Sequence, residues 1–290
     1  GLISLIIFTI VFVICMAVNV IANDKPLLVN YDGEYYVPVL KAYPETAFGG
    51  IFETEANYKD PAVQQLIEAK GFYIMPPIAF ADQTPNVELG LPYPAAPNSQ
   101  NLLGTDDQGR DVLARILYGM RVSLLFGLAL TLTGAIIGII VGAIQGYYGG
   151  WVDLAGQRFM EVWGGMPQLF MIIILVSLFS PSIYVLFALM LLFGWMGLVG
   201  LVRAEFLRAR NFDYVRAARN LGVSDSQIMW RHILPNALAS SLSQLPFILT
   251  ANIIALTALD FLGYGLPPGS PSLGELMVQG KNNLDAPWLA

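Results

Sequence analysis

Few side chains of this sequence could perform covalent chemistry. The adjacent carboxylates Asp106 and Asp107 could act as general acid and base, but Arg110 follows them, and carboxylates beside an arginine usually cap helices or form ion pairs. His232 is the only histidine, which leaves little from which to build a Ser-His-Asp triad or a zinc site. No G-x-x-x-x-G-K-[ST] motif occurs, so the chain does not bind ATP through a P-loop of its own. We therefore expect a non-catalytic protein with no cofactor or metal of its own.

The segment from Tyr214 to Pro235 is the most informative part of the chain. Residues 211–221 are predicted to form a short amphipathic helix that ends at Gly222. The sequence 224–227 then reads as a capping box that opens a second helix, which Leu234-Pro235 is expected to break. A basic loop at a membrane is often only an anchor for anionic lipid, but two capped helices are more structure than an anchor requires.

The elements that position this loop are membrane helices. Hydrophobic residues make up 56% of the chain and charged residues 12%, against about 25% charged in soluble domains. Four uncharged stretches, 1–23, 122–152, 162–202 and 232–259, suit a bilayer, which needs about 20 apolar residues per helix. The third has room for two helices around the turn at 180–182. We predict an all-α integral membrane fold with five spanning helices, over approximately 1–22, 121–145, 158–179, 183–203 and 238–262.

Charge asymmetry predicts the orientation. Residues 203–231 carry six arginines against three acidic residues, and residues 23–111 carry thirteen acidic against five basic residues. Because Lys and Arg collect on the cytoplasmic side, the loop 204–237 and the N-terminus are expected inside and residues 23–111 outside. Residues 1–22 are expected to be an uncleaved anchor helix, since their apolar run exceeds the roughly 7–15 residues of a signal-peptide core.

The external segment 23–111 holds ten of the eighteen prolines, which favours extended and turn conformations over a packed domain. Two local structures are still predicted: a hairpin within 27–40 around Asp32-Gly33, and a helix that begins at Asp60-Pro61 and ends at Gly71. The segment could bind a partner protein or the substrate, or be a solvated lid. Its acidic surplus excludes nucleic acid as a partner.

A further helix is predicted to begin near Gln108, capped by Thr105 and Asp106. Asp107 and Asp111 would suit its positive end. Three arginines are expected to lie along the membrane interface with their stems in lipid; they are Arg110, Arg115 and Arg121.

Glycines recur every fourth residue in the predicted helix 121–145 and just beyond it, at Gly134, Gly138, Gly142 and Gly146. Such a stripe shares one helix face and lets a neighbouring helix approach closely. Irregular backbone is expected at 164–167, at 194–197 and at Pro246. Asp260 could line a functional cavity, although a place at the outer interface without a specific role is preferred. The scarcity of charge within the helices argues against proton- or sodium-coupled transport.

The loop also resembles a known family. Ala217-Ala218, Gly222 and Leu234-Pro235 fall at the spacing of the coupling loop, named EAA, of ABC importer permeases. The ending 232–236 and the stretches 104–112, 146–153 and 261–265 are similar to the oligopeptide, dipeptide and nickel branch. The likeness covers residues 101–290, and the long external segment most resembles C-type permeases of microcin C and oligopeptide importers. Arg216 replaces the acidic residue that opens the family's pattern, and Asp260 replaces a small polar residue.

This resemblance implies a type I importer fold, with 112–290 as the transmembrane domain and a sixth helix beyond Ala290. It implies a multi-pass subunit of the bacterial inner membrane that moves peptides by alternating access. A cytoplasmic ATPase would dock on the loop, through the residues Tyr214, Arg216, Ala217, Ala218, Gly222, Leu234 and Pro235. The implied partners are a second permease subunit, two nucleotide-binding domains that hold ATP and Mg, and a periplasmic peptide-binding protein. The substrate-binding residues stay unknown.

Two other classes of function stay open at this point. An ion-coupled carrier or channel would work without an ATPase, but it should need intramembrane carboxylates. A membrane protease would need a Ser-His dyad within the membrane, and the one histidine lies in the loop.

Overall fold

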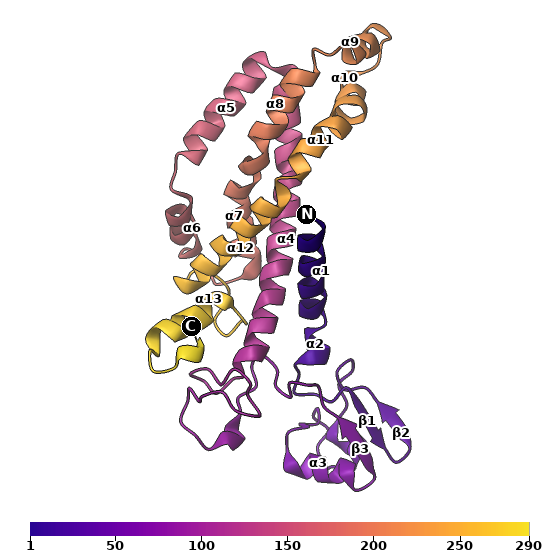
Figure 1. Cartoon of the computed structure of the whole chain (residues 1–290), viewed down its shortest axis with the longest axis vertical. Helices are drawn as coiled ribbons and strands as arrows, with labels where there is room; N and C mark the ends of the chain where they lie inside the picture. The colour runs from indigo at the N-terminus through magenta and orange to yellow at the C-terminus, as the bar shows by residue number, and fades with distance from the viewer. Residues whose placement is uncertain (290) are drawn as a thin grey trace. The chain divides into compact units, whose positions relative to one another are not determined.

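The computed structural model describes residues 1–289, and most of its regular structure is helical. Figure 1 shows the order of the elements along the chain. Two compact units are formed, one by residues 1–123 with 269–289 and the other by residues 124–268. The long helix α4 (Val112–Tyr148) contributes to both units.

Two helical segments are long and apolar enough to cross a bilayer: α4 and the run Ile183–Ala209. That run joins α7 (Ile183–Gly194), the 3-10 turn η3 (Trp195–Leu198) and α8 (Val199–Ala209). The bent pair α5 (Gly150–Gly164) and α6 (Gln168–Val176) makes a third span if it is counted as one. Two shorter apolar helices are α1 (Leu2–Met16) and α12 (Leu245–Phe261). A helical membrane fold with two to three clear spans is therefore confirmed.

Several predicted helix bounds were wrong, because the helices are either longer or broken. α4 has 37 residues, more than the 121–145 expected. The predicted helix 158–179 is divided at 165–167, where α5 and α6 meet at 70°. The predicted helix 238–262 is divided at Ser243-Gln244, and Pro246 lies in the first turn of α12, where its missing N–H has no partner to lose.

The glycine stripe of α4 faces η3 and α8 within the second unit. An added Cβ at Gly138 would lie 2.6 Å from the Trp195 carbonyl oxygen. The same atom at Gly142 would lie 2.8 Å from Val199 O, and at Gly146 2.5 Å from Arg203 O. At Gly134 the nearest atom would be 3.6 Å away, which is ordinary contact. The glycines at 138, 142 and 146 thus face residues 195, 199 and 203 in the same order. The two helical segments therefore run parallel, with their backbones close together.

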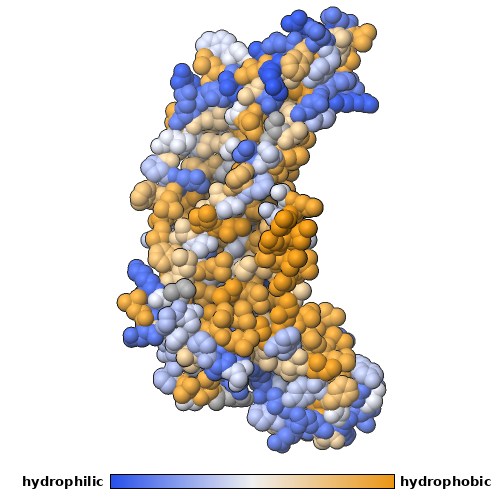
Figure 2. Space-filling model, viewed as in Figure 1, coloured by the Kyte–Doolittle hydropathy of each residue, from blue (hydrophilic) through white to orange (hydrophobic). Residues whose placement is uncertain are grey.

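The loop between α8 and α12 is itself helical. It contains α9 (Asp213–Asn220), α10 (Asp225–Gln227), the π-helix η4 (Ile228–Ile233) and α11 (Leu234–Leu242). Figure 2 shows hydrophilic residues gathered over the region of α9 and α10, and hydrophobic residues over the visible surface of α1. The two surfaces suit water and lipid respectively.

The first unit contains a three-stranded antiparallel sheet of order β2-β1-β3. Its strands are β1 (Leu28–Tyr31), β2 (Glu34–Tyr36) and β3 (Gly71–Ile74). The predicted hairpin is confirmed, with Asp32 and Gly33 at φ 53° and 84° in the turn, as a type I′ turn requires. α3 (Pro61–Glu68) starts as predicted, with the Asp60 side chain accepting from the Ala62 N–H at 2.9 Å, but it ends before Gly71.

The expectation that segment 23–111 forms no packed domain was wrong, and so was an all-α description of the whole chain. Rings of Tyr31, Tyr36 and Tyr58 meet Phe48 edge-on at centroid distances of 5.2–5.8 Å. Val29, Val63 and Ile67 complete this buried cluster. Six of the ten prolines lie between 76 and 97, after the sheet, where the only helical turn among the described residues is η2 (Val87–Leu89). The 3-10 helix η1 (Glu45–Phe48) carries the central ring.

Two arginines at the start of α4, Arg110 just before it and Arg115 in its first turn, form a largely buried ion-pair network, contrary to the expectation that they lie along lipid. Arg110 contacts Asp106 at 2.7 Å and Glu275 at 3.1 Å. Arg115 is fully buried and contacts Glu275 at 2.7 Å. Glu275 lies in α13 (Leu273–Asn282), which η5 (Pro287–Leu289) follows. Arg121 alone keeps part of its surface open, and it donates to Asn19 Oδ1 at 2.9 Å.

The start of α4 also differs from the prediction. The helix begins at Val112, where Asp111 Oδ1 accepts from the Ala114 N–H at 2.7 Å. Asp111 is buried and this burial raises the pKa of its carboxyl. Asp106 instead accepts from the N–H groups of Gln108 and Arg110, each at 2.9 Å, and closes its own turn. Asp106 also forms ion pairs with Arg110 and Arg115. These contacts agree with a structural role for Asp106, which the sequence favoured over a catalytic one.

The remaining helix of the first unit is α2 (Val18–Ile21). Val18 of α2 and Ala22, which follows it, pack against Ala114 and Tyr118 of α4, and the Tyr118 hydroxyl donates to Ala22 O at 2.9 Å. In the second unit, Asp260 accepts from the Leu266 N–H and thereby holds the turn after α12.

Candidate coupling surface

The loop between α8 and α12 begins with two successive helices, α9 and α10, as predicted. α9 covers Asp213–Asn220, and Gly222 follows it with φ 81°, a left-handed conformation that favours glycine. The Ser224 hydroxyl accepts from the Gln227 N–H at 3.4 Å and opens α10. Local signals were enough here, because capping side chains and helix-ending glycines act on the nearest backbone groups.

Pro235 does not break the second helix, so that prediction was wrong. Helical structure continues from Asp225 to Leu242, with a π-helical stretch at Ile228–Ile233 directly before Leu234-Pro235. A proline removes one N–H and crowds the carbonyl of the preceding turn. A locally widened helix relieves this conflict without ending the helix.

One face of α9 is attached to the rest of the second unit. Val215 and Ala218 are buried against a cluster that includes Phe206, Ile228 and Ile233. Of the residues predicted to contact an ATPase, Ala218 therefore packs inward, and Leu234 is partly buried against the same cluster. The other predicted residues, Tyr214, Arg216, Ala217, Gly222 and Pro235, are exposed.

The exposed side of the loop also carries apolar residues that the sequence prediction missed. Leu221 is 84% exposed, directly before Gly222. Phe212 and Trp230 are exposed as well. The sequence did carry a signal for this surface. Leu221 follows a short amphipathic helix whose apolar face is formed by other residues, so its side chain is left outside that face. Apolar groups left in water beside arginines form a surface suited to a protein partner.

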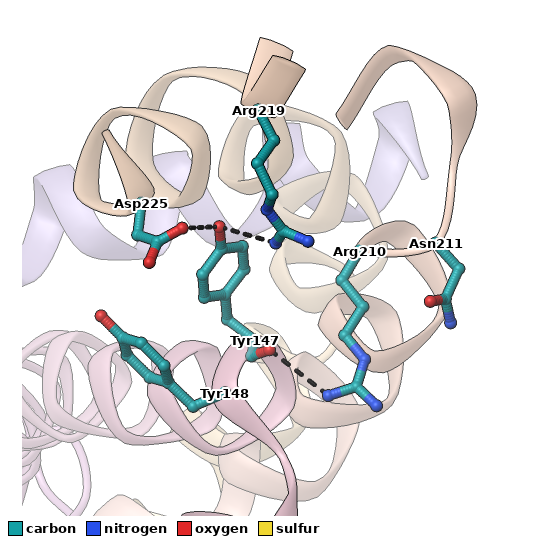
Figure 3. A pocket seen from close by; sticks show the side chains of 6 residues that line it. All are labelled: Tyr147, Tyr148, Arg210, Asn211, Arg219 and Asp225. Atoms are coloured by element: carbon teal, nitrogen blue, oxygen red, sulfur yellow. Dashed lines mark hydrogen bonds between the residues drawn. The ribbon is translucent and has the colours of Figure 1, made fainter. Parts of the chain in front are cut away.

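A tyrosine at the end of α4 fastens the loop. The Tyr147 hydroxyl donates to Asp225 Oδ1 at 2.5 Å and accepts from Arg219 Nη2 at 3.1 Å (Figure 3). The hydrogen bond between Arg219 and Tyr147 raises the pKa of the Arg219 guanidinium above its ordinary value. Because Arg219 lies in α9 and Asp225 in α10, one side chain of α4 contacts both helices. We call these three residues the Tyr147 clasp.

Arg210 forms a second link to α4. Its Nη1 donates to Gly146 O at 3.5 Å and to Tyr147 O at 3.3 Å, which are carbonyls of the last turn that have no helical partner. A positive charge also suits the negative end of a helix. Gly149, with φ 63°, leaves room for this side chain, since a Cβ there would collide with Arg210.

An ion pair joins α5 to α8 on the same side of the second unit. Arg203 binds Asp153 with two nitrogens, one of which, Nη2, lies 2.7 Å from Oδ2. Bidentate pairs of this kind fix orientation as well as distance. Within residues 1–289 no group of three His, Cys, Asp or Glu side chains could hold a metal ion.

Comparisons with known proteins identify relatives of this chain. A family model described as "binding-protein-dependent transport system inner membrane component" matches residues 134–290. The inner membrane ABC transporter permease protein YejE of Escherichia coli is 58% identical over 286 residues, which cover 99% of this chain and 84% of that protein. The peptidoglycan transport system permease protein YejE of Agrobacterium fabrum is 50% identical over 97% of this chain and 80% of its own. The oligopeptide transport system permease protein OppC of Lactococcus lactis subsp. lactis is 35% identical over 68% of each chain.

Proposed function

Because the chain belongs to the family of inner membrane components of binding-protein-dependent transport systems, we propose that it is a permease subunit of an ATP-driven importer of peptides. The names of its relatives support this substrate class, since they include oligopeptide and peptidoglycan transport systems. Peptide antibiotics such as microcin C fall within the same chemical class. The mechanism is alternating access, in which differential contacts with two states of a partner shift the permease between inward and outward forms.

The observation that carries the proposal is the two-sided helix α9. Its buried side, Val215 and Ala218, attaches it to the second unit, and its other side presents Tyr214, Arg216 and Ala217 to solvent. A partner ATPase docks on that exposed side together with Leu221 and Gly222. ATP and Mg are bound by the partner, because this chain has no P-loop.

The contacts around the loop support a path for transmission into the membrane. Displacement of α9 pulls on Arg219 and hence on Tyr147 at the end of α4. α4 in turn lies against η3 and α8 along Gly138, Gly142 and Gly146, where an added Cβ would meet backbone carbonyl oxygens at 2.5–2.8 Å. Close-packed interiors transmit displacement because they have few voids to absorb it.

The remaining parts of the proposal follow the family. Five helices cross the membrane in this chain, with the N-terminus and 204–237 in the cytoplasm and 23–111 in the periplasm. A second permease subunit, two nucleotide-binding subunits and a periplasmic peptide-binding protein complete the transporter. Leu234 and Pro235 act by supporting the loop from its C-terminal side.

The test is a charge placed on the docking side. Leu221→Asp removes an apolar contact and would bury a carboxylate in the interface, so we expect at least a tenfold loss of affinity for the ATPase, or about 1.4 kcal/mol. The loss of affinity is measured as the amount of ATPase that co-purifies with the membrane-extracted permease. Leu284→Asp is the matched control, because Leu284 is 85% exposed and lies in the first unit. Equal ATPase recovery with both variants would reject the docking side.

A further inference from the structure

A hollow of about 550 Å³ lies between the end of α4 and the loop. Its lining consists of Tyr147, Tyr148, Arg210, Asn211, Arg219 and Asp225. Figure 3 shows side chains from α4, from the end of α8 and from α9 and α10 around it. None of the residues predicted to contact an ATPase lines this hollow, so the docking proposal does not use it.

The lining carries two guanidinium groups and one carboxylate, so it is net positive. Asp225 already accepts a hydrogen bond from Tyr147. Within residues 1–289, the hydrogen bonds of Arg210 use only its Nη1 and those of Arg219 only its Nη2. Each guanidinium has five N–H donors, so most of the donors of both groups are left for a ligand that only accepts.

The remaining lining residues add neutral donors. Asn211 is exposed and uses its side-chain nitrogen on Leu207 O at 3.3 Å, an interaction near the limit for a hydrogen bond. The Tyr148 hydroxyl makes no hydrogen bond within the described part of the chain, and the residue is 53% exposed. Paired arginines with neutral donors beside them are the usual protein recognition set for a phosphate group.

We propose that this hollow binds a phosphate group, held between Arg210 and Arg219. A phosphodiester of an anionic lipid headgroup and free phosphate share this chemistry. The surroundings suit the lipid: Tyr148 is the last residue of the apolar helix α4, and Trp151, which is 83% exposed, lies in the first turn of α5. Tyr and Trp gather at the level of lipid headgroups, where basic pockets between helices hold them. The bound phosphate adds a bridge between the ends of α8 and α9.

The experiment uses the full chain purified in detergent. Native mass spectrometry counts retained phosphatidylglycerol against phosphatidylcholine at equal concentrations. We expect at least tenfold preferential retention of phosphatidylglycerol in the unchanged protein. In a second arm, inorganic phosphate is added at constant ionic strength, and the Tm of the lipid-depleted protein is recorded, since a ligand of the folded state raises it.

Two variants test the location. Arg210→Gln with Arg219→Gln removes both cations, and Asn211→Asp adds a carboxylate without removing any member of the Tyr147 clasp. Both should abolish the preference. Arg208→Gln with Arg231→Gln is the matched control, because these arginines are also exposed in the loop region but do not line the hollow.

The outcomes separate the two sources of phosphate. Preferential lipid retention that inorganic phosphate leaves unchanged identifies the headgroup as the ligand. A Tm increase with inorganic phosphate, without lipid preference, identifies the free ion. The proposal is overturned if neither effect occurs, or if Asn211→Asp and the control pair retain the ligand equally.

Discussion

At the residue scale, the Tyr147 hydroxyl ties the end of α4 to both helices of the loop. It joins Arg219 and Asp225, and hydrogen bonds to charged groups contribute about 1.5–3 kcal/mol each. Tyr147→Phe removes both bonds and keeps the ring. We expect backbone amides of α9 to exchange with solvent at least tenfold faster, because local opening of α9 becomes less costly. Hydrogen exchange measured on peptides that cover 213–227 detects this change.

Tyr148→Phe provides the control for that measurement. It makes the same chemical change one residue along the chain, at a hydroxyl without a hydrogen bond within residues 1–289. Unchanged exchange in both variants would show that Tyr147 does not hold the loop.

The Tyr147 clasp could not be predicted from the sequence, because the partners of Tyr147 lie 72 and 78 residues away along the chain. The capping by Ser224 could, since its acceptor and donor are three residues apart.

At the element scale, the contact between α4 and α8 depends on three of the four stripe glycines. Gly146→Ala places a Cβ 2.5 Å from Arg203 O and 2.6 Å from the Cβ of Phe206, so the helices must separate. We expect a loss of about 1–3 kcal/mol, typical of overpacking. Gly134→Ala meets nothing closer than 3.6 Å and gains helix propensity, about 0.8–1 kcal/mol. Melting of the purified full chain should thus give a lower Tm for the first variant and an equal or higher Tm for the second.

Equal melting of the two glycine variants would contradict this account of the stripe.

The elements also show where prediction from sequence stops. The Asp32-Gly33 turn and the Asp60 cap are local, and both were predicted. The packing of the first unit depends on tyrosines spread from Tyr31 to Tyr58 that meet on Phe48, and proline content concealed it. Pro235 was misread because the π-helix that accommodates it has no signature in the residue types.

At the scale of the whole molecule, charge asymmetry predicts which way the chain faces the membrane. Thirteen acidic residues in 23–111 and six arginines in 203–231 favour a periplasmic and a cytoplasmic location respectively. Single cysteines test this directly. In a Cys15→Ala background, Glu53→Cys and Ser226→Cys place exposed thiols in the two segments. A membrane-impermeant maleimide applied to spheroplasts should label position 53 at once and position 226 only after the membrane is permeabilised.

Cys15 is buried, so the background substitution removes only slow labelling. An even number of helices between the two thiols would put both on one side, and they would then react together. Two or three spans are clear from length and composition, and α1 and α12 are too short to be counted by those criteria. The labelling therefore decides more than orientation. If position 226 is protected while position 53 reacts, the chain must cross the membrane an odd number of times between them. The three candidate spans are α4, the bent pair α5–α6 and the run Ile183–Ala209, and together they meet this requirement.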